Sequence, residues 1–285
     1  MSPTFLTALQ PIRTRENKAI SSNDLHVHGA VCSFIASKIT PFAHFPLPML
    51  SKNQIKRYAK LKQKKFRELE GLYLAEGAKL VEDLIRRGAQ AECIAVRQGV
   101  QNALSQATLA PEDFEKLSAL DNPSGVLGVF KKNAFQTATV SWVLMLDGIR
   151  DPGNMGTLLR TADWFGLNRI VCSPDTVDCF NPKAVQASMG SVHAVSVEYT
   201  ALSAYIEKEG LPVFGTFMEG AEISQTALPE KGILIMGNEG QGIRPAIIPQ
   251  ITHKVSVVRH PKSQAESLNV ATAAAICMAA LPTRM

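Results

Sequence analysis

The chain has 285 residues, of which 46% are hydrophobic and 19% are charged, and its formal net charge is +5. This length is enough for one large domain or two ordinary ones, each with its own core. No uninterrupted apolar run is long enough to span a bilayer, so we expect no membrane partner. The small positive excess is compatible with a polyanionic partner but does not identify one.

The first 48 residues differ in composition from the rest, being rich in Ser, Thr, Pro and His, with Glu16 and Asp24 as their only acids. They lack the continuous apolar core and small-residue cleavage site of a secretory signal. Three interpretations stay open: a disordered tail, a wrongly assigned start with the natural one at Met49, or an organellar transit peptide. We favour the first two.

A dense basic segment follows, with eight Lys or Arg residues between Ser51 and Arg67. Apolar residues recur in it at helical spacing, and Ser51 can cap its start, so we expect one basic amphipathic helix. Such a helix is either a solvated face over a small core or a surface that binds phosphates of a nucleic acid. The absence of intervening acids favours the second interpretation, with Lys52, Lys56, Arg57, Lys60 and Lys64 as the binding residues.

Short alternating elements then predict a small α/β domain over residues 49–132, followed by a polar linker at 133–139. Its strands are expected at 71–74, 91–97 and 126–130, and its helices at 78–87 and 111–120. Glycines and the Asn-Pro-Ser-Gly turn at 122–125 separate these elements.

Residues 140–285 form a run of β-α repeats, which predicts a parallel sheet covered by helices. Strands are expected at 140–146, 169–172, 194–198, 213–217, 233–236 and 254–258, and helices at 154–165, 182–189, 201–209 and 267–281. Ligands of such sheets bind beyond the carboxyl ends of the strands.

Three polar segments interrupt the apolar pattern at such strand ends. The first is DGIRDPGNMG at 147–156, continuing to Arg160; the second is GNEGQG at 237–242; the third is ESLNV at 266–270, where Ser267 is expected to cap the last helix. Taken singly, each has an ordinary explanation as a cap, a glycine turn or core packing. The glycine spacing matches neither the dinucleotide fingerprint nor the P-loop, which counts against other nucleotide-binding α/β proteins.

The order and spacing of the three segments, NxGxxxR, GNEGxG and SLNVxxAxA, closely resemble the SPOUT superfamily of RNA methyltransferases. The branch they resemble is the TrmH or SpoU family of ribose methyltransferases, and the likeness covers about Val140 to Leu281. The stretch 122–126 is similar to the end of that family's substrate-binding domain, which is like a ribosomal protein. The chain departs from the family at 257–266, which is longer and more basic than the usual Ile-Pro-Met stretch and offers Arg259 or Lys262 to a phosphate.

This resemblance implies a C-terminal parallel-sheet domain with a deep trefoil knot, behind a small RNA-binding α/β domain. It implies a homodimer that transfers a methyl group from S-adenosyl-L-methionine to a ribose 2′-hydroxyl of rRNA or tRNA. The motif positions carry over as the active-site residues Asn154, Arg160, Glu239, Ser267 and Asn269. The cofactor would be bound by Thr216, Gly237, Asn238, Val257 and Leu268.

Two alternatives concern the reaction. A non-catalytic RNA-binding or ribosome-assembly protein on the same scaffold would be expected to have lost Asn154, Arg160 or Asn269, and all three are intact. A nucleobase could also receive the methyl group instead of the ribose.

The role of Arg160 is a separate question. In the family an arginine at this position is the proposed general base, yet guanidinium is effectively always protonated, so a clamp on the RNA phosphate is the other role.

The five cysteines form no C-x-x-C pair, and the histidines complete no zinc-ligand spacing. We therefore expect no metal, and reduced, mostly buried thiols in a cytoplasmic protein. The sequence leaves open which RNA and which nucleotide are modified.

Overall fold

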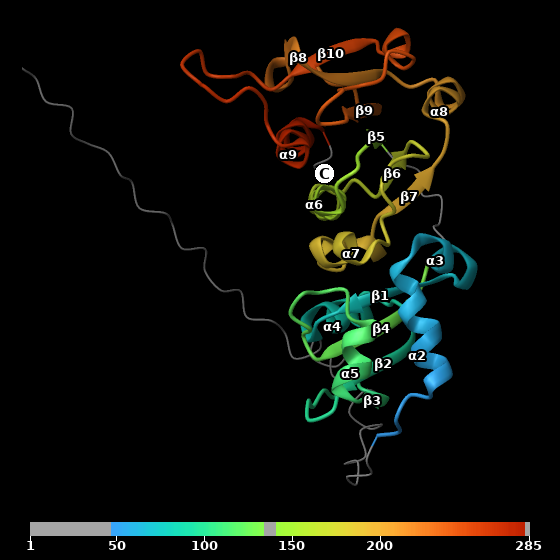
Figure 1. Cartoon of the computed structure of the whole chain (residues 1–285). Coiled ribbons are helices and arrows are strands. Elements are labelled where there is room, and N and C mark those ends of the chain that lie inside the picture. Colours follow the sequence, from blue (N-terminus) through green and yellow to red (C-terminus); the bar gives the residue numbers. More distant parts are fainter. Residues whose placement is uncertain (1–46, 134–140, 283–285) are drawn as a thin grey trace, which may run out of the picture. The chain divides into compact units, whose positions relative to one another are not determined.

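The computed structural model describes residues 47–133 and 141–282, which form a four-stranded and a six-stranded sheet with their helices (Figure 1). Apart from residues 47, 48 and 133, the expected tail and the expected linker lie outside the described residues. The α/β class and the parallel arrangement of the larger sheet are confirmed.

The smaller sheet has the order β1 (Leu72–Glu76), β4 (Val126–Lys131), β2 (Ala91–Arg97), β3 (Ala107–Leu109). Strand β4 runs antiparallel to both of its neighbours, whereas β3 is parallel to β2. Strand β3 was not expected, because three residues are too few for an alternating pattern to be recognised. The carbonyl of Pro48 accepts a bond from Thr108 N at 3.0 Å, so ordered pairing begins before the expected domain boundary at 49.

Four helices accompany this sheet: α2 (Lys52–Ala59), α3 (Lys64–Glu70), α4 (Ala78–Arg86) and α5 (Pro111–Leu117). Ser51 caps α2 as expected, accepting a bond from Gln54 N. The expected single helix through Arg67 is wrong, because a 3-10 turn at Lys60–Lys62 and an extended Gln63 divide it. The cause is Arg67, which turns inward and donates from Nη1 to the carbonyls of Leu61 and Lys62 at 2.9 Å each.

The larger sheet has the order β10 (His253–Ser256), β8 (Val213–Glu222), β9 (Gly232–Gly237), β5 (Trp142–Asp147), β6 (Arg169–Cys172), β7 (Ser196–Tyr199), and every pair of neighbours is parallel. Strand β8 extends five residues beyond its expected end. Gly220 allows this, since a Cβ there would lie 2.8 Å from the carbonyl oxygen of Lys254 on β10.

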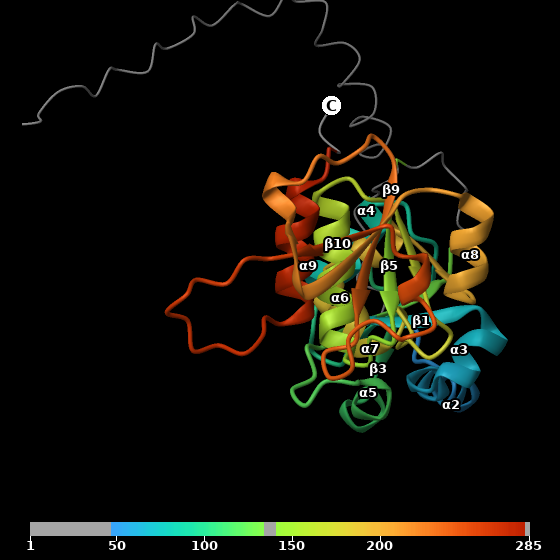
Figure 2. The ribbon, with the colours of Figure 1, turned by 90° about the horizontal axis from the view of Figure 1, so that it is seen from above.

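Helices cover both faces of this sheet. Figure 2 shows α8 (Leu202–Glu209) on one side and α6 (Pro152–Trp164) and α9 (Val270–Ala280) on the other. Leu144, Leu158 and Ala274 belong to the core beneath α6 and α9, whereas Val143 and Tyr205 belong to the core beneath α8. The central strands are therefore buried on both faces, which explains their continuous apolar runs.

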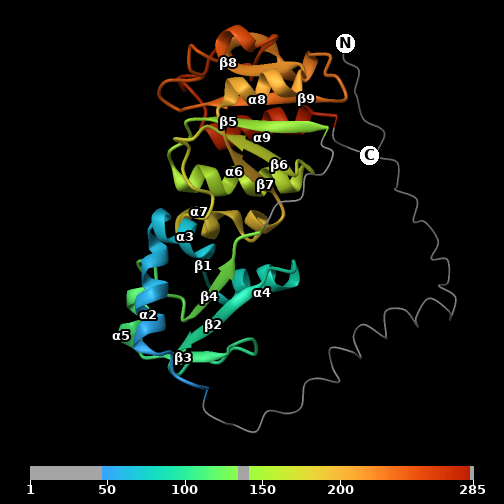
Figure 3. The same ribbon diagram turned by 90° about the vertical axis from the view of Figure 1, so that its right-hand side faces the viewer.

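Helix α7 (Pro182–Ser188) packs against β1 and so connects the two sheets (Figure 3). The ring centroids of Tyr73 and Phe180 lie 4.8 Å apart. Nearby, Arg67 Nε donates to Asp178 Oδ2 at 2.8 Å, and the Arg67 side chain is only 2% exposed. A buried pair of this kind requires a defined geometry, so the contact fixes how the basic segment meets the loop between β6 and α7.

The last helix begins three residues later than expected, at Val270. Ser267 as its N-cap is wrong, because the side chain of Asn269 caps it instead, accepting bonds from Ala271 N at 2.9 Å and Thr272 N at 3.3 Å. Ser267 thus remains in the loop before the helix, where it lines a cavity described below.

Candidate active site

Three polar loops follow the carboxyl ends of β5, β9 and β10, and a chain of hydrogen bonds joins them. Asn269 Nδ2 donates to Asn154 Oδ1 at 2.9 Å, and Asn154 Nδ2 donates to Glu239 Oε1 at 2.6 Å. Asn154 lies in the first turn of α6, whose N-cap Asp151 accepts a bond from Asn154 N at 2.8 Å. Asn154 is thereby joined in one cluster with Glu239, which is 85 positions away in the sequence, and with Asn269, which is 115 positions away.

A cavity of about 680 Å³ lies beside this cluster. All five residues expected to bind the cofactor, Thr216, Gly237, Asn238, Val257 and Leu268, line it, as do Glu239 and Ser267. Apolar side chains that the sequence did not single out, such as Phe217, Met218, Met236 and Cys277, complete its walls. Its size and its mixture of apolar walls with a few polar groups suit a small organic ligand.

Gly237 lines the cavity, and the loop that follows it leaves no room for a side chain at this position. A Cβ at this position would lie 2.3 Å from the carbonyl carbon of Gly242 and 2.4 Å from Ile243 N. The loop after β9 consequently folds back on itself, with reciprocal backbone bonds between Asn238 and Gly242 at 2.8 and 3.0 Å. This turn exposes Glu239 at its tip.

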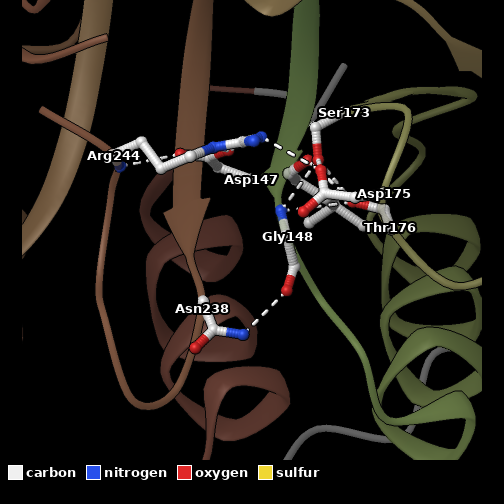
Figure 4. A network of polar contacts seen from close by, with 8 residues as sticks. Asp147, Gly148, Ser173, Asp175, Thr176, Asn238 and Arg244 are labelled. Atoms are coloured by element: carbon white, nitrogen blue, oxygen red, sulfur yellow. Dashed lines mark hydrogen bonds and ion pairs between the residues drawn. The ribbon is translucent and has the colours of Figure 1, made fainter. Parts of the chain in front are cut away.

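A second polar network fixes the base of the same loop to the end of β5 (Figure 4). Arg244 donates to the buried carboxylate of Asp147 from its backbone N at 2.8 Å and from Nε at 2.6 Å. Asn238 Nδ2 donates to the carbonyl of Gly148 at 2.7 Å, and Gly148 N donates to Ser173 Oγ at 2.9 Å. The loops that carry Glu239 and Asn154 are therefore tied together at Asp147 and Gly148.

One guanidinium faces two carboxylates in this network. The hydrogen bond to Asp147 raises the pKa of the Arg244 guanidinium, and Arg244 also forms an ion pair with Asp175 at 3.2 Å. The pKa of the Asp175 carboxyl is lowered, first by the hydrogen bond from Ser173 and further by Arg244. The sequence did not reveal these residues as a group, although an acid at the end of a fully apolar strand was a signal that Asp147 needs a partner.

Arg160 lies apart from the hydrogen-bonded cluster. Its side chain is exposed on α6, and it is not among the residues that line the cavity. Asn154, which lies earlier on the same helix, is in the cluster. The structure therefore brings together Asn154, Glu239 and Asn269, places Ser267 on the cavity wall, and leaves Arg160 facing solvent.

The basic segment before β1 presents exposed Lys52, Lys56, Lys60 and Lys64. Arg57 differs from them because its guanidinium pairs with two carboxylates, Glu70 at 2.8 Å and Glu92 at 2.6 Å, whereas Lys64 has one longer ion pair, with Glu68 at 3.7 Å. These carboxylates, which come from α3 and β2, could not be assigned to Arg57 from the local sequence. Its charge is largely neutralised within the molecule, whereas Lys52 and Lys56 carry theirs on an open helix surface.

Neither a metal centre nor a membrane span is found in the part of the chain that the structure describes. Within residues 47–133 and 141–282, no group of three or more His, Cys, Asp or Glu side chains could hold a metal ion, and no helix is long and apolar enough to cross a membrane. The four cysteines in these ranges, Cys93, Cys172, Cys179 and Cys277, are free and buried, and burial raises the pKa of the Cys277 thiol to about 11.

Comparison with known proteins agrees with this geometry. Residues 141–279 match the model of the SpoU rRNA methylase family, and residues 52–128 match that of the MRM3-like substrate binding domain. The 23S rRNA (guanosine(2553)-2′-O)-methyltransferase RlmP of Bacillus subtilis is 33% identical over 237 residues, which are 79% of this chain and 95% of that protein. The chain belongs to the SpoU rRNA methylase family.

Solved structures support the family assignment across both sheets. A structure from Porphyromonas gingivalis, assigned to the TrmH family of RNA methyltransferases, is 34% identical with a TM-score of 0.71 and covers 81% of this chain and 98% of that one. An AdoMet-bound rRNA methyltransferase from Sinorhizobium meliloti is 25% identical with a TM-score of 0.70, covering 83% of this chain and 96% of that one. The SpoU family resemblance drawn from the three motifs is thus confirmed.

Proposed function

We propose that this chain is an S-adenosylmethionine-dependent methyltransferase that methylates a ribose 2′-hydroxyl of ribosomal RNA. The observation that carries the proposal is the meeting of the Asn269–Asn154–Glu239 hydrogen bonds with the cavity beside them. Membership of the SpoU family and the 2′-O-methyltransferase activity named for the Bacillus subtilis relative support it.

The residues around the cavity fit S-adenosylmethionine. Gly237 lets the loop after β9 fold back closely against Gly242, the walls are largely apolar, and Thr216 Oγ1 donates to the carbonyl of Ile235 at 2.9 Å. Thr216, Gly237, Asn238, Val257 and Leu268 would hold the cofactor. When bound, it supplies an electrophilic methyl group attached to a positively charged sulfur.

The chain's own residues would position the ribose and stabilise charge. Asn154 and Asn269 present a fixed amide surface next to the cavity, so they would orient the ribose, and Ser267 would shape the loop on the cavity wall. Arg160, exposed on α6, is suited to clamp an RNA phosphate through a two-pronged hydrogen bond. Holding two reactants in line can itself supply a large part of the rate.

RNA would bind along the basic segment before β1. Lys52, Lys56, Lys60 and Lys64 offer exposed ammonium groups there, whereas Arg57 holds the helix to Glu70 and Glu92. Each lysine that neutralises a phosphate releases counterions, which makes binding depend on salt. The match of residues 52–128 to a substrate-binding domain supports this role for the front part, here taken as residues 49–132.

Further proposals concern assembly. A homodimer is supported by large apolar side chains on the covering helices, since Trp164 on α6 is 83% exposed and Ile276 on α9 is 41% exposed. A trefoil knot in residues 140–285 is proposed from membership of the SpoU family, whose resemblance implies it. A cytoplasmic location is supported by the free, buried thiols of the described residues.

The test is methyl transfer from labelled S-adenosylmethionine into unmodified RNA, fractionated into ribosomal and transfer RNA, with the Arg160→Ala variant as control. We expect label in ribosomal RNA and a large decrease in the control. Label in transfer RNA alone would change the proposed substrate. Cofactor binding without any transfer would favour a non-catalytic RNA-binding protein on this fold.

A further inference from the structure

Methyl transfer to a ribose requires that the 2′-hydroxyl lose its proton, and one side chain must accept it. We propose that Glu239 is this general base. The inference rests on the proposed function, and it gives Glu239 the proton-accepting role that the motif resemblance gives to Arg160.

The placement of Arg160 argues against a role as base. Its guanidinium is exposed on α6 and does not line the cavity. A guanidinium also keeps its proton at any ordinary pH, and it offers donors but no acceptor. Glu239, in contrast, lines the cavity.

The direction of the hydrogen bonds in the cluster identifies its accepting end. The side-chain oxygen of Asn269 must face Ala271 N and Thr272 N, because only an oxygen can accept their bonds. Its Nδ2 therefore points to Asn154 and acts as the donor, which in turn forces Asn154 to donate to Glu239. The chain runs in one direction, from the cap of α9 to the carboxylate, where it ends.

The Glu239 carboxylate, at the end of this chain of hydrogen bonds, can still accept a proton. Asn154 holds one carboxylate oxygen of Glu239 at 2.6 Å. A carboxylate has about four acceptor positions on its two oxygens, so the other oxygen can accept the ribose hydroxyl while the first stays fixed. The glycine turn keeps this residue at the loop tip, and the Asp147–Arg244 network holds the base of the loop.

Other charged or titratable groups near the cavity are less suited. Asp151 is engaged as the cap of α6, and Arg150 and Arg259 are guanidinium groups. His260 Nδ1 accepts a bond from Lys262 N at 3.2 Å, so a neutral ring carries its hydrogen on Nε2 and has no free acceptor. Glu266 lines the cavity but has no part in the hydrogen bonds that join the three motifs.

Proton transfer and methyl transfer balance each other in this step. The O–H bond of the ribose breaks and its proton passes to the carboxylate of Glu239. An electron pair on the ribose oxygen forms the new bond to the methyl carbon, whose bond to sulfur breaks with its electron pair remaining on sulfur. The positive charge of the sulfonium is thereby neutralised, and Glu239 later returns the proton to solvent.

The experiment compares wild type with Glu239→Gln in single-turnover methyl transfer to RNA over a range of pH. The amide oxygen of glutamine can still accept the bond from Asn154, so a purely positioning role would survive the substitution. Binding of S-adenosylhomocysteine and of RNA, each by calorimetry, and thermal unfolding provide readouts independent of turnover. The His260→Asn variant is measured alongside.

We expect the Glu239→Gln rate to fall by about 100-fold or more while both binding constants stay within about threefold of wild type. The residual rate should then rise about tenfold per pH unit, because hydroxide must replace the missing base. A Glu239→Gln rate close to that of wild type would overturn the inference, as would disappearance of the base-dependent pH profile in His260→Asn instead. Absence of 2′-O-methylation by wild type would refute the proposed function itself, which keeps the two failures distinct.

Discussion

Asp147 and Arg244 lie 97 positions apart, yet Arg244 contacts the Asp147 carboxylate through both its backbone nitrogen and its guanidinium. The Asp147 side chain is fully buried, whereas that of Arg244 is 43% exposed. The pair joins the end of β5 to the loop that carries Glu239 and lines the cavity. It thus couples the stability of the carboxyl end of β5 to the shape of the cavity.

Replacement of Arg244 by methionine should lower both stability and cofactor affinity. A buried carboxylate deprived of its partner is costly, and because Arg244 is partly exposed we expect about 2 kcal/mol rather than the full cost of a buried pair. Denaturant unfolding and calorimetric binding of S-adenosylhomocysteine measure the two effects. The matched control is Asp175→Asn, which removes the ion pair between Arg244 and Asp175 but keeps the contact of Arg244 with Asp147. An equal effect of both variants would contradict the importance of Asp147.

Acid should weaken the ion pair between Asp175 and Arg244. The pKa of Asp175 is lowered from its ordinary 3.8 by Ser173 and Arg244. Since the folded pKa lies below the unfolded one, this stabilisation is present above the unfolded pKa and is lost as pH falls through the folded pKa. Between neutral and strongly acidic pH, the unfolding midpoint of wild type should therefore fall more than that of Asp175→Asn; parallel curves would contradict this.

A methyl group at Gly237 should impair the cavity. The added Cβ of Gly237→Ala would meet the backbone of Gly242 at 2.3 Å, which forces the loop to move. We expect S-adenosylhomocysteine affinity to fall at least about tenfold, equivalent to about 1.4 kcal/mol. Gly240→Ala is the control in the same loop, because its Cβ would meet only Asn238 Oδ1, at 3.6 Å. Equal affinity of the two variants would show that the close approach at Gly237 does not shape the site.

Two substitutions of Asn269 should separate its two tasks. Asn269→Ala removes the helix cap and should cost about 1 kcal/mol in stability, together with activity. Asn269→Asp retains a capping oxygen but cannot donate to Asn154, so the Asn154 amide loses its fixed direction toward Glu239. Its stability should remain near that of wild type while its methyl-transfer rate falls, as compared by thermal unfolding and single-turnover assays. Full activity of Asn269→Asp would contradict the directed hydrogen-bond chain.

Removal of the exposed lysines should weaken RNA binding and its salt dependence. With Lys52, Lys56, Lys60 and Lys64 changed to glutamine, the slope of log affinity against log salt should become shallower by about 0.7 to 0.9 for each phosphate that is no longer neutralised. S-adenosylhomocysteine binding should not change. A control with the same decrease in charge replaces Lys79, Lys183, Lys208 and Lys231, and equal weakening in both variants would indicate a general charge effect instead of a site.

Much of the fold could be predicted from local pattern. The apolar runs of β5 and β9 and the alternation of strands and helices indicated the parallel sheet, because central strands are buried on both faces. Helix starts were less predictable, since Ser267 and Asn269 are both good caps and tertiary contact with Asn154 favours the second. The break before Gln63 depends on Arg67 reaching back to carbonyls at 61 and 62, a contact that spacing does not reveal.

The candidate site could be predicted only in part. The three motifs identified Asn154, Glu239 and Asn269, but not the direction in which their side chains donate. The pairing of Asp147 with Arg244 joins distant loops and leaves no periodic trace in the sequence. Arg160 illustrates the converse, because its motif position was clear while its place outside the cavity wall depends on the orientation of α6.

The position of the transferred methyl group tests the central claim most directly. RNA labelled by the wild-type enzyme is hydrolysed in alkali, which requires a free 2′-hydroxyl next to each cleaved phosphate. Because a methylated ribose blocks cleavage at that phosphate, we expect the label in an alkali-resistant dinucleotide. Label recovered in a mononucleotide would place the methyl group on a base and contradict ribose methylation.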